Sequence, residues 1–280
     1  MVKNLNLSFG PHLAFLQPEL TNLRRFGVPR DGGYVGPPES IANNSVIFCF
    51  GLSYEWSFET EITSQVKNTR FIAFDPTVSF GIFVIEVLKS FKHLFNFGDN
   101  ESAYRRFRVF GYRLKVVKNY VFSFYFQRNQ HIKKWVKGEK VNLKNCISIA
   151  EIFFEFGKDK EIILKIDIEG DEFELLEELL KLGQISAVRS LFIEFHDLDL
   201  NWQKFSEIVH KLKETHSLVH LHLPNMRTDL TEYGVPKFLE MTFIKSGLLN
   251  TKNEHRDSLP VVDVDFPNRP ECPDFKVKFQ

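Results

Sequence analysis

The stretch that decides the fold is Leu164-Lys165-Ile166-Asp167-Ile168-Glu169-Gly170-Asp171-Glu172-Phe173-Glu174-Leu175-Leu176. It starts within an apolar run, Ile162 to Ile168, which is interrupted only by Lys165 and Asp167 and predicts a buried strand. The chain then breaks at Gly170. Beyond the glycine, apolar residues at helical spacing predict an amphipathic helix: Phe173, Leu176 and Leu180. The stretch therefore predicts a strand, a tight turn and a helix, the repeating unit of an α/β sheet.

Three carboxylates crowd the end of this predicted strand, those of Asp167, Glu169 and Asp171. Open α/β sheets bind their ligands at the carboxyl ends of their strands. Clustered acids cost free energy unless a cation or a hydroxyl group meets them, so the turn is a candidate site. We assign a simpler role to Asp171, Glu172 and Glu174, because acids in the first turn of a helix stabilise its dipole. Asp167 lies inside the strand and keeps its place in the site.

Composition narrows the class of protein. A chain of 280 residues suggests one domain spanning 1–280 with a sizeable insertion, since domains average about 150 residues. The formal net charge of 0 argues against nucleic-acid binding by phosphate neutralisation. Three widely separated cysteines with no CxxC pair favour a reducing cytosol over a disulfide framework. We therefore expect a cytoplasmic protein with no nucleic-acid partner.

The first residues, 1–8, lack the apolar core of a signal peptide. The longest apolar run, Phe80 to Leu88, contains Glu86 and is too short to span a bilayer. We expect no membrane span.

Two further strands precede the deciding stretch. Val46 to Phe50 is continuously apolar and is followed by a turn at Gly51, and Arg70 to Phe74 is a second buried strand that ends at Asp75. Asp75 follows Gly51 by about the spacing at which Rossmann-like folds place the carboxylate that binds a ribose diol. There is one glycine in the turn and no GxGxxG motif, so this pattern alone does not identify which nucleotide cofactor the fold binds.

The second half of the chain continues the alternation. Ala187 to His196 is a predicted strand ending in Glu194 and His196, and Trp202 to Thr215 is a predicted helix. Leu218 to Asn225 and Phe238 to Ile244 are two strands with no helix between them, which predicts a terminal antiparallel hairpin.

The remaining segments are less regular. Residues 1–40 form an N-terminal segment whose glycine-rich part, Arg24 to Val35, is either a hairpin turn or a loop near a ligand. Residues 80–150 form a predicted lid or insertion on the substrate side, with a short third strand over Phe95 to Asp99 and one or two strands over Val116 to Gln127. Its basic stretches either face solvent or bind an anionic substrate. Residues 250–280 form an extended tail.

The segment Lys165 to Phe173 resembles the K-x-D-x-E-G-x-E signature of FkbM-type methyltransferases, which use S-adenosylmethionine (SAM). Other segments of about residues 25 to 245 match that family in order: 31–35, 50–59, 75–76, 193–196, 222–225 and 239–243. The resemblance departs at Ser53, where a second glycine is common. It implies a Rossmann-like seven-stranded methyltransferase sheet that closes with the antiparallel hairpin.

The same resemblance implies an O-methyltransferase that acts on a hydroxyl of a saccharide or glycan precursor, from a surface polysaccharide or a secondary metabolite. The alternatives are a small-molecule O- or N-methyltransferase, a NAD-binding Rossmann enzyme and a non-catalytic binding domain. We expect the acceptor to be a small molecule or saccharide, and the basic, aromatic segment 104–137 suits an anionic one.

The expected site residues fall into three groups. A cofactor site is expected from the resemblance and from the strand ends, and it comprises Gly33, Tyr34, Gly51, Ser53, Asp75 and Asp99. Asp167, Glu194 and His196 are the expected catalytic residues, because a hydroxyl acceptor needs a base and His196 has a suitable pKa. Asp167 and Glu194 could instead hold Mg²⁺, which would acidify the hydroxyl. Glu169 and His222 are further candidates, whereas His220 is expected on the opposite face of its strand; each histidine could also be a packing residue.

Overall fold

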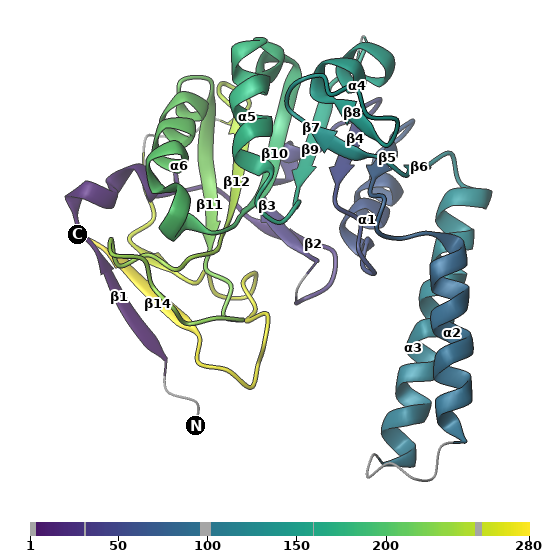
Figure 1. Cartoon of the computed structure of the whole chain (residues 1–280). Helices are drawn as coiled ribbons and strands as arrows, with labels where there is room; N and C mark the ends of the chain where they lie inside the picture. The colour runs from purple at the N-terminus through teal and green to yellow at the C-terminus, as the bar shows by residue number, and fades with distance from the viewer. Residues whose placement is uncertain (1–3, 31, 96–101, 159, 250–253) are drawn as a thin grey trace.

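The computed structural model describes residues 4–30, 32–95, 102–158, 160–249 and 254–280. A mostly parallel seven-stranded sheet forms the centre of the molecule (Figure 1). Its strands, in spatial order, are β11 (His216–His222), β12 (Leu239–Lys245), β10 (Val188–Phe195), β9 (Ile162–Ile166), β4 (Val46–Phe50), β5 (Arg70–Phe74) and β6 (Gln130–Ile132). Only β12 runs antiparallel to its neighbours. The predicted α/β class, the seven strands and the terminal antiparallel pair are confirmed, and the sheet is compatible with a Rossmann-like fold.

Side chains of the central strands alternate between two cores. In β4, Phe48 and Phe50 face one core, and Ile47 and Cys49 face the other. The helices of the described residues are α1 (Ser57–Gln65), α2 (Phe80–Leu94), α3 (Ala103–Val121), α4 (Ile149–Phe156), α5 (Glu172–Lys181) and α6 (Leu198–Lys213). Helices α4, α5 and α6 pack on the first face and α1 on the second, giving three layers. No helix in the described parts of the chain is both long and apolar enough to cross a membrane.

Short elements connect and cover these layers. They are the 3₁₀-helices η1 (Pro11–Leu16), η2 (Pro38–Ser40) and η4 (Gln184–Ala187), the π-helix η3 (Phe122–Phe126), and the strand pairs β2 (Arg24–Phe26) with β3 (Tyr34–Gly36) and β7 (Trp135–Lys137) with β8 (Cys146–Ser148). The N-terminal strand β1 (Leu5–Phe9) pairs in parallel with β14 (Phe275–Phe279), which also pairs with β13 (Ser258–Leu259). The predicted extended tail therefore ends as the middle strand of a small sheet.

The predictions for residues 80–150 need two corrections. The strands expected over Val116 to Gln127 are wrong, because this stretch completes α3 and forms η3. Val116, Tyr120 and Phe124 recur every four residues and pack together in the core that contains Trp56, which is the helical spacing. The expected third strand over Phe95 to Asp99 is not supported at Phe95, which is the C-cap of α2.

Residues 96–99 of that expected third strand lie outside the described residues. The strand that pairs with the outer side of β5 is instead β6, within a stretch expected to form a basic lid.

A buried polar cluster fastens the C-terminal tail to β11. The carboxylate of Asp265, 1% exposed, accepts hydrogen bonds from His220 Nε2 at 2.9 Å and from the Val261 backbone N–H at 2.7 Å. His222 Nδ1 lies 3.6 Å from the same carboxylate. His220 and His222 are two residues apart and meet one partner, so the expectation that they face opposite sides is wrong. A strand repeats its side-chain direction every second residue.

We expect Asp265→Asn to lower the free energy of unfolding by about 1.5–3 kcal/mol, the value of buried hydrogen bonds to a charged group. Burial would raise the pKa of Asp265, but His220, His222 and the Val261 N–H hold it well below its usual range. Its stabilisation is therefore present above about pH 4 and is lost as the pH falls through the folded-state pKa. Urea unfolding across pH 3 to 7 measures both effects. Asp263→Asn is the matched control, since Asp263 is exposed. Equal effects of the two substitutions would contradict a stabilising role for the buried polar cluster.

Candidate active site

A cavity of about 360 Å³ opens at the carboxyl ends of β4, β5 and β9. Such a volume falls within the range of about 300–1,000 Å³ typical of small-molecule sites. The residues that line it are Gly32, Gly51, Leu52, Ser53, Glu55, Phe74, Asp75, Pro76, Thr77, Lys134, Trp135, Val136, Lys165, Asp167, Ile168, Glu169, Asp171, Glu194 and Met226. The cavity therefore combines the glycine turn, the second strand's acid and the acidic turn after β9 in one place.

The turn after β4 requires a glycine. Gly51 has φ of +83°, and a Cβ on it would collide with the carbonyl oxygen of Asp167. The backbone of β4 can thus run close to that of β9 only because this residue has no side chain. Ser53, which follows in the same turn, has φ of +51° and lines the cavity.

Asp75 holds this turn in place. Its Oδ2 accepts hydrogen bonds from the backbone N–H groups of Leu52 at 2.9 Å and Ser53 at 3.0 Å, and its Oδ1 accepts from the N–H of Thr77 at 2.7 Å. The Thr77 hydroxyl donates a fourth bond at 2.5 Å. Burial would raise the pKa of Asp75, but these bonds outweigh burial and lower it. An ionised carboxylate accepts about four hydrogen bonds, so a ribose hydroxyl would share or replace one of them.

One of the residues that line the cavity is a buried lysine. Lys165 is 3% exposed, and its Nζ donates to the Gly51 carbonyl at 3.0 Å and lies 3.8 Å from both Glu59 Oε1 and Asp167 Oδ2. Burial would lower the pKa of Lys165, but the acids around it, which include Glu194, raise it. A charged ammonium group therefore joins the glycine turn to the acidic turn. From the sequence, Lys165 was predicted only to interrupt an apolar run.

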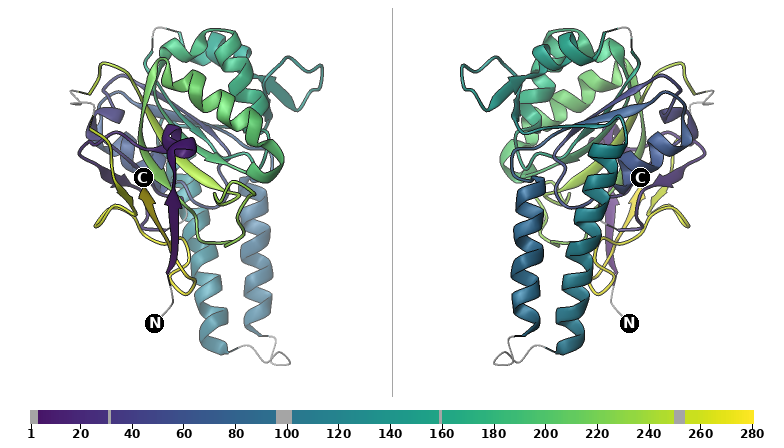
Figure 2. Two further views of the ribbon diagram at one scale, coloured as in Figure 1. Left: turned by 90° about the vertical axis from the view of Figure 1, so that its left-hand side faces the viewer. Right: turned by 90° about the vertical axis from the view of Figure 1, so that its right-hand side faces the viewer.

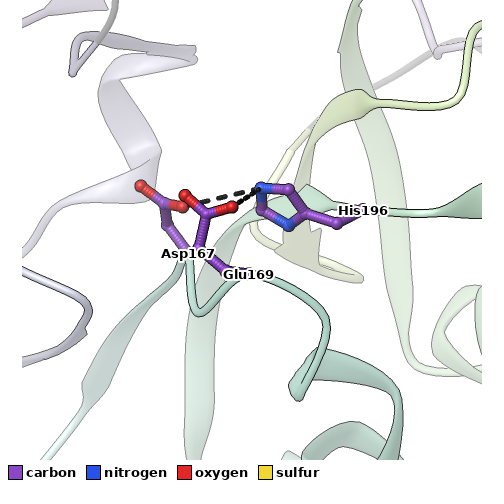
Figure 3. A group of neighbouring side chains, drawn as sticks. All are labelled: Asp167, Glu169 and His196. Carbon is purple, nitrogen blue, oxygen red and sulfur yellow. Dashed lines mark ion pairs between the residues drawn. The ribbon is translucent and has the colours of Figure 1, made fainter.

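Three of the carboxylates that line the cavity surround the side chain of His196. His196, 4% exposed, has its Nε2 at 3.9 Å from Asp167 Oδ1, 3.7 Å from Glu169 Oε2 and 3.6 Å from Glu194 Oε1. Figure 3 shows Asp167 and Glu169 pointing toward the same imidazole nitrogen. The three residues expected to be catalytic, and the further candidate Glu169, are thus brought together from β10 and from the loop after β9.

Glu172 contacts the opposite edge of the His196 ring, at Nδ1. Its fully buried carboxylate accepts the His196 backbone N–H at 2.6 Å and lies 3.3 Å from His196 Nδ1, while its second oxygen accepts the Gly170 N–H at 2.8 Å. Burial would lower the pKa of His196, but Glu172, followed by Asp167 and Glu169, raises it. The role assigned to Glu172 from the sequence, an acid of the helix dipole, is therefore incomplete. Asp171 pairs instead with Lys137, at 2.5 Å.

This arrangement can serve two kinds of chemistry. His196 does not itself line the cavity, but its Nε2 faces three carboxylates that do, those of Asp167, Glu169 and Glu194. With Nδ1 toward Glu172, a neutral His196 has its Nε2 lone pair on that side, where a general base would act. Alternatively, Asp167, Glu169 and His196 each offer one ligand atom, all within 4.8 Å of one another, and could hold a divalent cation. An imidazole among carboxylates suits a transition metal better than Mg²⁺. His196 Nε2 cannot serve as a general base and as a metal ligand at the same time.

Other expected site residues lie elsewhere. Gly33 and Tyr34 do not line the cavity, although Gly32 does. Tyr34 is buried on β3, and its ring centroid lies 5.7 Å from Lys165 Nζ. It therefore packs against a residue of the site without lining the cavity. His222 belongs to the tail cluster, where its Nε2 meets Asn268 Oδ1 at 2.9 Å. Asp99 lies outside the described residues.

Four residues of the site were not predicted from the sequence: Lys165, Glu172, Lys134 and Trp135. Lys134 and Trp135 line the cavity from the start of β7. Two signals for Lys165 were available in the sequence: a single charge inside an apolar strand, and the first position of the signature. The K-x-D-x-E-G-x-E signature ends at Glu172 and excludes Glu174, its exposed neighbour in the same helical turn, but it names no partner for Glu172.

We expect Glu172→Gln to lower the pKa of His196, because it removes the carboxylate charge that raises that pKa. NMR titration of the His196 ring measures the shift. The same substitution should lower the free energy of unfolding by about 1.5–3 kcal/mol, since it weakens buried hydrogen bonds. Glu174→Gln is the matched control and should change neither quantity. An unaltered His196 titration in the Glu172 variant would contradict the positioning role.

The sequence matches no protein-family model and no curated protein. The fold class and the site geometry are therefore argued from the residues of this chain alone, and membership of the FkbM family stays a prediction.

Proposed function

We propose that this chain is a SAM-dependent methyltransferase that acts on a hydroxyl of a saccharide or glycan precursor. The observation that carries the proposal is the strand order. Strands β6, β5, β4, β9 and β10 follow the order 3-2-1-4-5 shared by Rossmann-like sheets, and the antiparallel β12 then lies between β10 and β11. A dinucleotide-binding sheet would continue with a sixth parallel strand next to the fifth. The inserted antiparallel strand favours the methyltransferase reading over the NAD-binding one.

The residues that would hold SAM are those of the cavity. The turn at Gly51 offers backbone next to the cavity, and Asp75 stands at the end of the second strand, where the resemblance expects the ribose contact. Phe74 and Trp135 add aromatic wall. SAM supplies an activated methyl group, and the protein's task is to align an acceptor oxygen with it and to remove a proton.

The cluster around His196 suits that task. SAM would supply the methyl group, and His196 Nε2 would take the proton that the acceptor hydroxyl loses. Asp167, Glu169 and Glu194 lie within 3.6–3.9 Å of that nitrogen and would stabilise the imidazolium that forms. Glu172 fixes the ring from the opposite side. A divalent cation on Asp167 and Glu194 is the alternative way to acidify the hydroxyl.

The choice of a saccharide rests on the resemblance, and the cavity supports it in one respect. Trp135 lines the wall next to the acidic turn, and an aromatic ring beside hydroxyl-binding carboxylates suits a polyhydroxylated ring. Lys134 lies beside it and would meet a phosphate or carboxylate of an anionic acceptor.

We expect Asp75→Ala to weaken the binding of S-adenosylhomocysteine by about 1.5–3 kcal/mol, the value of hydrogen bonds to a charged group. The substitution removes the acceptor of four hydrogen bonds that shape the turn, as well as a ribose contact. Isothermal titration calorimetry measures the change. Glu161→Ala is the control, because Glu161 lies at the opposite end of β9, where it pairs with Arg189. Unchanged affinity in a folded Asp75 variant would remove Asp75 from the cofactor site.

The proposed activity is tested by incubating the protein with methyl-labelled SAM and a panel of free, phosphorylated and nucleotide-linked sugars. Label should appear on a sugar hydroxyl, and a parallel reaction with a chelator separates the two mechanisms. Full activity with the chelator leaves His196 as the base, and loss restored by added metal assigns the cluster to a cation. Transfer to a non-sugar acceptor alone would favour the small-molecule alternative. No transfer together with no SAM binding would favour a binding domain.

A further inference from the structure

Helices α2 and α3 form a hairpin that projects from the rest of the molecule. Figure 1 and both views of Figure 2 show the two helices side by side, extending beyond the other elements. The base of the hairpin is anchored, because Phe83, Val116 and Tyr120 are buried in the core that contains Trp56. A packed base and a projecting body indicate an ordered arm rather than a loose loop.

The arm exposes large apolar side chains. Ile85 is 52% exposed, Leu88 is 56% exposed and Phe107 is 64% exposed. Further apolar residues on the two helices are also exposed: Ile82, Phe91, Tyr104, Val109, Tyr112 and Leu114. Apolar surface gathered on one element in this way marks a site that binds a protein or a membrane.

The arm is also strongly basic. Its two helices carry eight Lys and Arg residues, of which Arg106 is buried, and one acid, Glu86. The sequence between the helices adds two acids, Asp99 and Glu101, so the arm keeps a positive excess although the whole chain has a formal net charge of 0. Glu86 is already paired, with Lys89 at 3.3 Å and Arg113 at 3.2 Å. The positive excess favours an anionic partner and opposes the pairing of this arm with the same arm of a second copy.

The combination of exposed apolar and basic side chains on the arm favours one kind of anionic partner over another. A nucleic acid would engage the basic residues and stack on Phe and Tyr, but the aliphatic side chains of Ile82, Ile85 and Leu88 offer no stacking surface. An anionic bilayer uses both properties, since lipid headgroups attract Lys and Arg while aliphatic and aromatic side chains enter the boundary with the acyl chains. We propose that the α2–α3 arm binds the surface of an anionic lipid membrane. The proposal does not depend on the proposed enzymatic function.

Co-sedimentation of the full chain with vesicles tests the proposal without any activity measurement. Vesicles contain phosphatidylcholine alone or with phosphatidylglycerol, and each is used at low and high salt. We expect binding to the anionic vesicles that is at least about tenfold tighter than to neutral ones and that weakens at high salt.

Two variants assign the binding to the arm. Ile85→Glu with Leu88→Glu removes exposed apolar surface, and Lys115→Glu with Lys118→Glu reverses exposed charge. Each pair should weaken vesicle binding at least about tenfold. Phe154→Glu is the matched control and should bind like the parent, because Phe154 is 88% exposed but lies on α4. Circular dichroism checks folding, and the lysine pair, which changes no packed side chain, decides the outcome if the apolar pair fails to fold.

Several results would overturn the proposal. They are no binding to anionic vesicles, binding that neither arm variant weakens, or equal loss in the Phe154 control. Binding of an RNA oligonucleotide without vesicle binding would point to a nucleic acid instead. A dimer detected by light scattering that the arm variants dissociate, again without vesicle binding, would point to a second copy.

Discussion

Lys165→Met should lower the free energy of unfolding by about 3–5 kcal/mol, the effect of removing one partner from a buried charge pair. The ammonium group is buried among Glu59, Asp167 and the Gly51 carbonyl, so its loss leaves all three without the cation that they share. The side chain of Met has a similar length, which limits the contribution of an empty cavity. Chemical denaturation monitored by circular dichroism measures the change.

The pair can be separated from simple packing by a double-mutant cycle with Glu59→Gln. If the ion pair accounts for the loss, the two substitutions together should cost less than the sum of the two singles, by about 0.5–3 kcal/mol. Lys160→Met, at an exposed position just before β9, should change stability by less than about 0.5 kcal/mol. Additive effects of Lys165→Met and Glu59→Gln would contradict the coupling.

His196→Asn should reduce turnover by about 10²–10⁴-fold, the usual contribution of a general base. Asparagine keeps a polar side chain at this position but cannot take the acceptor proton. The structure raises the pKa of His196 above its ordinary value, and only the neutral ring can accept a proton. The wild-type rate should therefore rise with pH through that raised pKa and level off above it.

The variant should lose this ionisation from the pH–rate profile as well as activity. His12→Asn is the control, because His12 is exposed and lies on η1. Wild-type turnover of the His196 variant from pH 6 to 9 would return His196 to a packing role and leave Asp167 as the candidate base.

The central sheet was predictable because its strands carry continuous apolar runs. Val46–Phe50 and Ile162–Ile166 are buried on both faces, so every position is apolar or, at Lys165, held by buried partners. The secondary structure of residues 80–150 was harder to predict, because an arm exposed on several sides lacks the single apolar stripe that marks a packed helix. Its exposed Phe and Val residues resemble a strand in composition, and the short edge strand β6 carries no apolar run.

The site was predictable where chemistry follows strand ends and unpredictable where it depends on contacts across the chain. Asp167, Glu194 and His196 end neighbouring strands, so topology alone brings them near one another. Glu172 meets His196 across 24 residues because the helix after the turn packs back on the sheet. The signature includes Glu172 and not its exposed neighbour Glu174, but only the packing of α5 shows that Glu172 contacts His196.

The most direct test of the central claim is calorimetric titration of the protein with S-adenosylhomocysteine and, separately, with NAD. A methyltransferase cavity at the carboxyl edge of this sheet predicts saturable binding of S-adenosylhomocysteine at one site per chain and no heat of binding with NAD. Binding of NAD without binding of S-adenosylhomocysteine would contradict the account.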